Sequence, residues 1–152
     1  MNVILSSSDH IIVHDPSYQS LFEVANAIGC QVTKWRTSQV SQWDLDLDFL
    51  EKSIQPNTKA IVVNTPHNPT GYLLSKEKLV KIVEIAKKHN VYLFCDEVYK
   101  FLEHDERDRL PSAVDLYENG ITLGVMSKSF GLAGLRIGWV ASKNRFVLIY
   151  IQ

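Results

Sequence analysis

Ala60-Ile61-Val62-Val63 and Tyr92-Leu93-Phe94-Cys95, with the helical pattern between them, decide the fold of this chain. Both runs lack polar alternation, which is typical of strands that are buried on both faces of a sheet. From Lys76 to His89, apolar residues recur at three- and four-residue steps, which indicates one apolar helix face. The residues of that face are Leu79, Ile82, Val83 and Ala86. Strand, helix and strand in this order favour a parallel sheet.

The same alternation continues along the rest of the sequence. Short apolar runs bounded by Pro, Gly, Asn or Asp predict strands. The predicted strands are His10–His14, Gln31–Trp35, Ala60–Asn64, Val91–Cys95, Ile121–Met126 and Gly138–Ser142. The predicted helices are Tyr18–Ile28, Leu45–Ile54, Lys76–His89 and a short turn at Ala113–Tyr117. We therefore predict an α/β fold with three layers: a mainly parallel sheet with helices on both faces.

Composition and charge exclude several classes of function. The formal net charge of −1 gives no electrostatic basis for binding nucleic acid or an anionic membrane. The longest apolar runs, such as Phe146 to Ile151, are too short to span a bilayer, and the N-terminus lacks the layout of a signal peptide. Cys30 and Cys95 lie far apart, which favours free thiols over a disulfide framework or a zinc site. We expect a cytoplasmic protein without a metal site.

One Gly-rich stretch combines an amine and a guanidinium, Ser127-Lys128-Ser129-Phe130-Gly131-Leu132-Ala133-Gly134-Leu135-Arg136-Ile137-Gly138. A lysine that forms an imine needs an unencumbered, water-poor setting. The planar, permanently charged fork of an arginine suits a phosphate. Taken alone, Lys128 is a solvated surface lysine and Arg136 a member of a surface ion pair. The functional interpretation therefore depends on the motifs that accompany this stretch.

Two further motifs follow predicted strands. Asp96-Glu97-Val98-Tyr99 comes directly after Cys95, and ligands of α/β sheets gather at the carboxyl ends of strands. Asn68-Pro69-Thr70-Gly71 follows the strand that ends at Asn64, and its proline would hold the Asn68 amide in a rigid loop. A turn cap at the aspartate and a plain turn at Asn-Pro are the structural alternatives.

The motifs NTPHNPTG, CDEVY and SKSFGLAGLRIG, in this order, resemble those of the class I/II aminotransferases, which are fold-type-I pyridoxal-phosphate enzymes. The resemblance runs from about His10 to about Ser142. It implies pyridoxal 5'-phosphate as the cofactor and transfer of an amino group from an amino acid to a 2-oxo acid through a lysine aldimine. The family's full-length chains are homodimers. Lyases and synthases of the same fold share these residues and remain an alternative.

The resemblance implies a role for each matching residue. Lys128 forms the imine and moves a proton between substrate and cofactor. Asp96 pairs with the pyridine nitrogen, and keeps it protonated so that the ring withdraws electrons. Tyr99 and Asn68 donate hydrogen bonds to the phenolic oxygen, and Arg136 binds the phosphate. We expect Lys128, Asp96 and Tyr99 to be catalytic and all five residues to contact the cofactor.

The remaining assignments have structural alternatives. Ser127 or Ser129 adds a hydroxyl to the phosphate site, although Val125 occupies the place of the family's serine three residues before the lysine. Tyr18 falls where the family stacks an aromatic residue on the ring, and packing in the core is an equal alternative. Lys100 is the competing amine and is expected at the surface. His67 receives no role.

The chain is less than half as long as members of this family. We expect residues 1–152 to form a partial cofactor-binding large domain, without the N-terminal arm, the Gly-rich loop and the C-terminal small domain. The family's first strand pairs with its antiparallel last strand, so Gly138–Ser142 would here expose a free edge. Phe146–Ile151 is β-prone where the family continues into a long helix.

This shortness affects the expected activity. We expect the isolated chain to bind the cofactor only weakly and to catalyse no measurable transamination, because half of the phosphate ligands are missing. A non-catalytic remnant that partners a full-length homologue is the alternative from a different functional class. A third hypothesis is a split enzyme, which a second chain completes.

Overall fold

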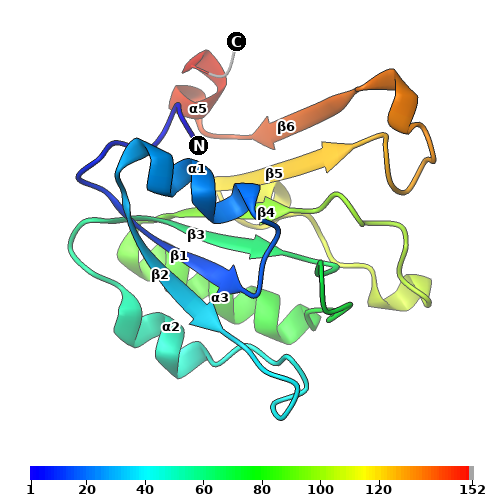
Figure 1. Cartoon of the computed structure of the whole chain (residues 1–152), viewed down its shortest axis with the longest axis horizontal. Helices are drawn as coiled ribbons and strands as arrows, with labels where there is room; N and C mark the ends of the chain where they lie inside the picture. The colour runs from blue at the N-terminus through cyan, green and yellow to red at the C-terminus, as the bar shows by residue number, and fades with distance from the viewer. Residues whose placement is uncertain (151–152) are drawn as a thin grey trace.

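Six short runs of apolar and β-branched residues form one sheet (Figure 1). The structure is a computed structural model that describes residues 1–150. Its strands are β1 (His10–Asp15), β2 (Gln31–Arg36), β3 (Thr58–Asn64), β4 (Tyr92–Asp96), β5 (Gly120–Val125) and β6 (Gly138–Ser142). Their order is β2-β1-β3-β4-β5-β6, in which β1 to β5 pair in parallel and β6 runs antiparallel to β5. All six predicted strands and the α/β class are confirmed.

In the part of the chain that the structure describes, five α-helices flank the sheet, and several of their ends are fixed by capping residues. They are α1 (Ser20–Ile28), α2 (Leu47–Ser53), α3 (Lys76–His89), α4 (Ala113–Leu116) and α5 (Arg145–Tyr150), with 3₁₀ turns at Glu106–Asp108 and Ala133–Leu135. The Ser75 hydroxyl accepts a hydrogen bond from the Lys78 amide at 3.1 Å and so caps α3. Gly29, with φ of 94°, ends α1. Among residues 1–150, no helix has the length and apolar character needed to cross a membrane.

The sheet divides the apolar core into two parts. Because successive residues of a strand point to opposite faces, Ile11 and Ile12 of β1 belong to different parts. The part beneath α2, α3 and α4 contains Ile12, Ile61, Val63, Leu50, Leu79 and Ala113. The part beneath α1 and α5 contains Ile11, Val13, Val62, Leu21 and Val147. Burial on both faces explains why β3 carries no polar alternation after Lys59, whereas Tyr92 and Phe94 of β4 remain partly exposed.

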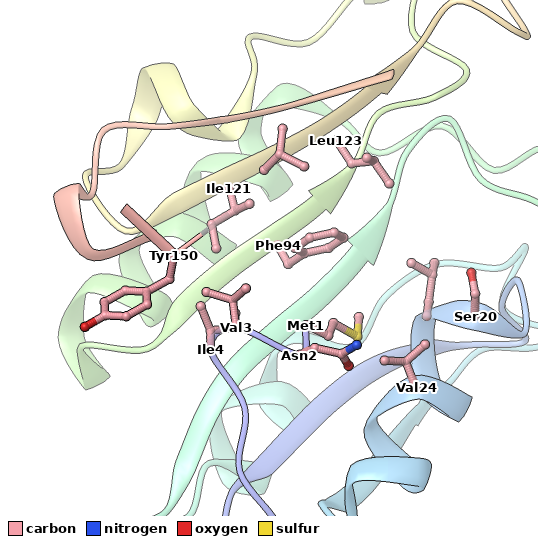
Figure 2. A pocket seen from close by; sticks show the side chains of 12 residues that line it. Met1, Asn2, Val3, Ile4, Ser20, Val24, Phe94, Ile121, Leu123 and Tyr150 are labelled. Carbon is pink, nitrogen blue, oxygen red and sulfur yellow. The ribbon is translucent and has the colours of Figure 1, made fainter. Parts of the chain in front are cut away.

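One side of the sheet remains open around β6. Within residues 1–150, β6 pairs only with β5, so its other edge is free, as the sequence predicts. A hollow of about 530 Å³ lies between α1, the N-terminal residues and α5. Phe94, Ile121 and Leu123 project into it from β4 and β5 (Figure 2). Its lining is mainly apolar. The described chain therefore presents apolar surface beside a free strand edge.

The prediction of β-prone structure for Phe146–Ile151 is wrong in its described part, because Arg145–Tyr150 is the helix α5. The Asn144 side-chain oxygen accepts hydrogen bonds from the amides of Phe146 at 3.0 Å and Val147 at 3.3 Å. Val147 is fully buried. A polar cap and one buried anchor thus outweigh the strand propensity of this segment. Ile151 lies outside the described residues.

The first residue of β5, Gly120, lies against the backbone of α4 and of the residue that follows it. A Cβ atom on Gly120 would lie 2.3 Å from the Ala113 carbonyl oxygen and 2.9 Å from that of Tyr117. Because backbone atoms cannot move aside cheaply, we expect Gly120→Ala to lower the free energy of unfolding by about 1–3 kcal/mol, measured by urea denaturation. Gly134→Ala is the control, since its Cβ would meet nothing within 4 Å. Equal losses of unfolding free energy in the two variants would show that the close backbone contact at Gly120 is not the cause.

Candidate active site

The polar motifs of the sequence meet at one edge of the sheet, where β3, β4 and β5 end. Asn64 and Asp96 are the last residues of β3 and β4 and lie side by side in the strand register. The turns after β4 and β5 carry Tyr99 and Lys128. β6 runs antiparallel to β5, so the start of β6 lies beside the end of β5. Arg136 directly precedes β6 and therefore lies at the same edge of the sheet. In Figure 1 the connections that follow β3, β4 and β5 all leave the sheet on this side.

Asp96 is a buried carboxylate at the centre of this edge. Its exposed fraction is 4%, and its Oδ1 accepts a hydrogen bond from the Val98 amide at 3.1 Å. Burial raises the pKa of Asp96 to about 6, the Val98 amide opposes that rise, and the charge of Glu97 adds to it. Within residues 1–150 no cation contributes to this pKa. The site therefore favours a ligand that brings a positive charge to Asp96.

Asn64, which the sequence analysis missed as a site residue, joins two of the motifs. Its side-chain amide donates to the Asp96 carbonyl oxygen at 2.9 Å. Its side-chain oxygen accepts from the Asn68 amide at 2.7 Å, so the loop after β3 is fixed to the end of β4. Asn68 and Tyr99 line a common hollow of about 400 Å³. A polar residue that ends a fully buried strand was the available signal for Asn64.

Lys128 and Tyr99 are brought together. The Lys128 Nζ atom lies 5.6 Å from the centroid of the Tyr99 ring, within the range of a cation–π contact. The Lys128 carbonyl oxygen accepts from the Gly131 amide at 3.0 Å, which closes a turn after β5. Ser127 is half-buried next to this lysine, whereas Lys128 itself is exposed.

Arg136 and Tyr18 lie at the same edge without joining the other residues. Arg136 is exposed, and its Nη1 donates to the Ala133 carbonyl oxygen of its own loop at 3.3 Å. Tyr18, in the loop after β1, is 56% exposed. Within residues 1–150 no hydrogen bond, ion pair or ring contact links either side chain to Asp96 or Lys128. No cluster of His, Cys, Asp or Glu suited to a metal ion is found in that range.

Lys100 is not the surface residue that the sequence predicts. Its side chain is 19% exposed, and its Nζ lies 3.1 Å from Glu97 Oε2 and donates to Ser112 Oγ at 2.6 Å. Glu97 Oε1 accepts from Thr122 Oγ1 at 2.9 Å. The Glu97 carboxylate is thus saturated by structural contacts, which leaves the preceding residue, Asp96, as the acid available to a ligand.

His67, to which the sequence assigns no role, stacks on His14 at the end of β1. The ring centroids are 3.7 Å apart with an interplanar angle of 16°, and both rings are buried. Burial lowers the pKa of His14 to about 3, with a contribution from His67, and burial lowers the pKa of His67 to about 4. His67 Nδ1 also lies 2.6 Å from Thr70 Oγ1. A pair of neutral imidazoles therefore supports the loop that carries Asn68.

This stack makes the stability of the protein depend on pH. Since the folded pKa values of His14 and His67 lie below the ordinary 6.5, their contribution is complete above pH 6.5 and is lost as pH falls toward 4. Asp96, whose folded pKa of about 6 exceeds the ordinary 3.8, has the opposite sign, because its contribution is lost as pH rises through 6. The variant Asp96→Asn removes this opposing pH dependence of stability.

In the Asp96→Asn background we expect the free energy of unfolding to fall between pH 6.5 and 4.5, by up to about 1.4 kcal/mol per pH unit per histidine. Urea denaturation at several pH values measures this slope. His14→Phe keeps an aromatic ring against His67 and should make the slope shallower. His104→Phe, at an exposed position, is the matched control. A slope that His14→Phe leaves unchanged would disprove the assignment.

Comparison with known proteins agrees with this fold. The sequence profile described as aminotransferase class I and II matches residues 1–151. Glutamate-pyruvate aminotransferase AlaA of Escherichia coli K12 is 36% identical over 143 residues, which cover 92% of this chain and 35% of that protein. A crystal structure of a PLP-dependent aminotransferase from Streptococcus suis gives a TM-score of 0.91 at 33% identity, over 99% of this chain and 39% of that one.

A third similarity extends the comparison to a different named enzyme. Aspartate aminotransferase of Thermus thermophilus with maleate gives a TM-score of 0.89 at 30% identity, over 96% of this chain and 38% of that one. The chain thus spans 35–39% of the length of these relatives. Because the family profile covers almost the entire sequence and the fold agrees, this chain belongs to the class I and II aminotransferase family.

Proposed function

We propose that residues 1–152 are part of the cofactor-binding large domain of a pyridoxal-phosphate-dependent aminotransferase, which moves an amino group from an amino acid to a 2-oxo acid. The observation that carries this proposal is Asp96, buried at the carboxyl edge with its pKa raised to about 6. A protonated pyridine nitrogen is a cation of the kind that would offset the cost of burying this carboxylate. Two free, buried cysteines, Cys30 and Cys95, agree with a reducing cytoplasm.

The residues of the edge fit the chemical groups of this cofactor. Asn68 and Tyr99 supply neutral donors for the phenolic oxygen, and Arg136 supplies a charged fork for the phosphate. Of the two serines beside Lys128, Ser127 is the one available to the phosphate, because the Ser129 hydroxyl already donates a hydrogen bond to the Lys100 carbonyl oxygen. Tyr18 supplies an aromatic face. When bound, pyridoxal phosphate would contribute an aldehyde carbon and an electron-withdrawing ring.

The remaining chemical roles belong to side chains of this protein. Asp96 would hold a proton on the ring nitrogen of the bound cofactor, and Lys128 would supply the amine that holds the cofactor's aldehyde carbon and exchanges a proton with the substrate. The face of Tyr99 lies beneath this amine. Because Arg136 and Tyr18 are exposed and separate from the other residues, we propose that the chain on its own binds cofactor weakly and does not turn over substrate.

Borohydride trapping tests the assignment of Lys128. After incubation with pyridoxal phosphate and reduction, we expect peptide mapping to find the main adduct on Lys128, at low yield. The adduct should vanish in Lys128→Ala and persist in Lys143→Ala, which removes an exposed lysine. Adducts spread evenly over surface lysines in all three proteins would overturn the assignment.

Arg136 is tested by comparing two aldehydes. We expect Arg136→Gln to reduce labelling of Lys128 by pyridoxal phosphate about tenfold, because a charge-assisted hydrogen bond contributes about 1.5–3 kcal/mol. Labelling by pyridoxal, which has no phosphate, should not change. Arg145→Gln is the control for loss of an exposed arginine. A similar loss with both aldehydes would show that Arg136 shapes the loop and does not bind phosphate.

A further inference from the structure

Two turns at the carboxyl edge are joined residue by residue, and two of the three contacts have no part in the proposed function. The Lys128 Nζ lies over the Tyr99 ring, and the next residue, Ser129, donates its hydroxyl hydrogen bond to the Lys100 carbonyl oxygen. The following pair, Phe130 and Phe101, meet edge to face with centroids 6.0 Å apart. Three consecutive residues after β4 thus contact three consecutive residues after β5.

The first of these turns is fixed by Lys100. Its amide donates to the Glu97 carbonyl oxygen at 3.0 Å, and its ammonium group pairs with the Glu97 carboxylate at 3.1 Å. The same ammonium group donates to Ser112 Oγ at 2.6 Å. Both ends of Lys100 are therefore held, and its carbonyl oxygen is a fixed acceptor for Ser129.

Glu97 in turn connects this turn to the sheet. Only 7% of Glu97 is exposed, and its amide donates to the Leu123 carbonyl oxygen of β5 at 2.9 Å. Its carboxylate accepts from Thr122 of β5 and from the Ala113 amide at the start of α4, each at 2.9 Å. A buried carboxylate whose acceptor sites are filled on several sides is a rigid anchor.

By contrast, the turn that carries the amine is held within itself by backbone hydrogen bonds, such as that from the Leu132 amide to the Met126 carbonyl oxygen at 3.1 Å, and most of its side chains are not buried. Lys128, Phe130 and Gly131 are exposed. A lysine side chain has about 2 kcal/mol of rotamer entropy to lose, so movement of this turn relative to the sheet would add to the range of positions open to its amine. The contact between Ser129 and Lys100 fixes the backbone next to the lysine.

We propose that Glu97, Lys100 and Ser129 are positioning residues that hold the Lys128 amine over the Tyr99 ring. The link from β5 through Glu97 and Lys100 to Ser129 transfers the rigidity of the sheet to the turn after β5. This inference deepens the proposed function and rests on it for the covalent step. The placement of the amine itself is a property of the chain without any ligand.

The first experiment observes the amine without cofactor. The full chain, lightly methylated on lysines with ¹³C, is studied by NMR, and Lys128→Arg assigns the Lys128 methyl resonance. We expect the Tyr99 ring current to separate this resonance from those of exposed lysines, and Tyr99→Leu to abolish the separation. Ser129→Ala should move the resonance toward those of the exposed lysines, whereas Ser129→Thr, which keeps the hydroxyl, should restore it.

Ser142→Ala is the matched control, because the Ser142 hydroxyl also donates to a carbonyl oxygen, that of Gly120, at 3.2 Å. It lies where β6 ends, away from Lys128, and its loss should leave the Lys128 resonance unchanged. Lys100→Met, which keeps the carbonyl acceptor but removes the charged anchor, should shift the resonance part of the way. A Lys128 resonance that is the same in Ser129→Ala as in the unmodified sequence would overturn the inference.

A second experiment separates this inference from the proposed function. Borohydride trapping with pyridoxal phosphate should label Lys128 about tenfold less in Ser129→Ala than in the unmodified sequence, since small misplacements of a reacting group cost large factors in rate. The NMR resonance decides the positioning role, and the adduct decides the function. A resonance that depends on Ser129 without any Lys128 adduct would sustain the positioning role and refute the proposed function. A Lys128 resonance that does not depend on Ser129, together with an adduct that forms equally in both proteins, would refute the positioning role and leave the function standing.

Discussion

The burial of Ala60–Val63 in β3 and of Leu93 and Cys95 in β4 is the constraint on which the rest of the structure depends. These buried positions have no room for polar side chains, so the polar groups of the site lie at the residues where the two strands end. Asn64 and Asp96 occupy those positions in neighbouring strands, and the Asn64 amide bonds to the Asp96 backbone. The loops that follow inherit their positions from this edge, and the candidate site is therefore a product of core packing.

Two adjacent acids take different roles because their surroundings differ. Glu97 is surrounded by donors from β5, α4 and Lys100, which satisfy its charge within the fold. Asp96 receives one backbone amide and lies in a region that raises its pKa to about 6. Environment, and not residue type, determines which carboxylate is structural and which is available to a ligand.

The sequence was sufficient to predict the elements of the fold, because periodicity and burial act over short stretches. The six strands and the helix Lys76–His89 follow from that local signal. Contacts between distant residues could not be predicted in this way. The stack of His14 on His67 and the burial of Lys100 both depend on side chains from other elements. The helix α5 was missed because the cap from Asn144 competes with strand propensity. The motifs predicted Asp96 and Lys128 near the carboxyl ends of strands, where the structure has them, but not the exposed orientations of Arg136 and Tyr18.

The reversal of direction at β6 has a mechanical consequence. Lys128 lies on the outgoing arm and Arg136 on the returning arm of the single connection between β5 and β6. A movement of that connection displaces the amine and the guanidinium together. The covalent and the ionic attachment that we propose for these two residues are thus mechanically linked, and a shift of the backbone of this connection would move both groups.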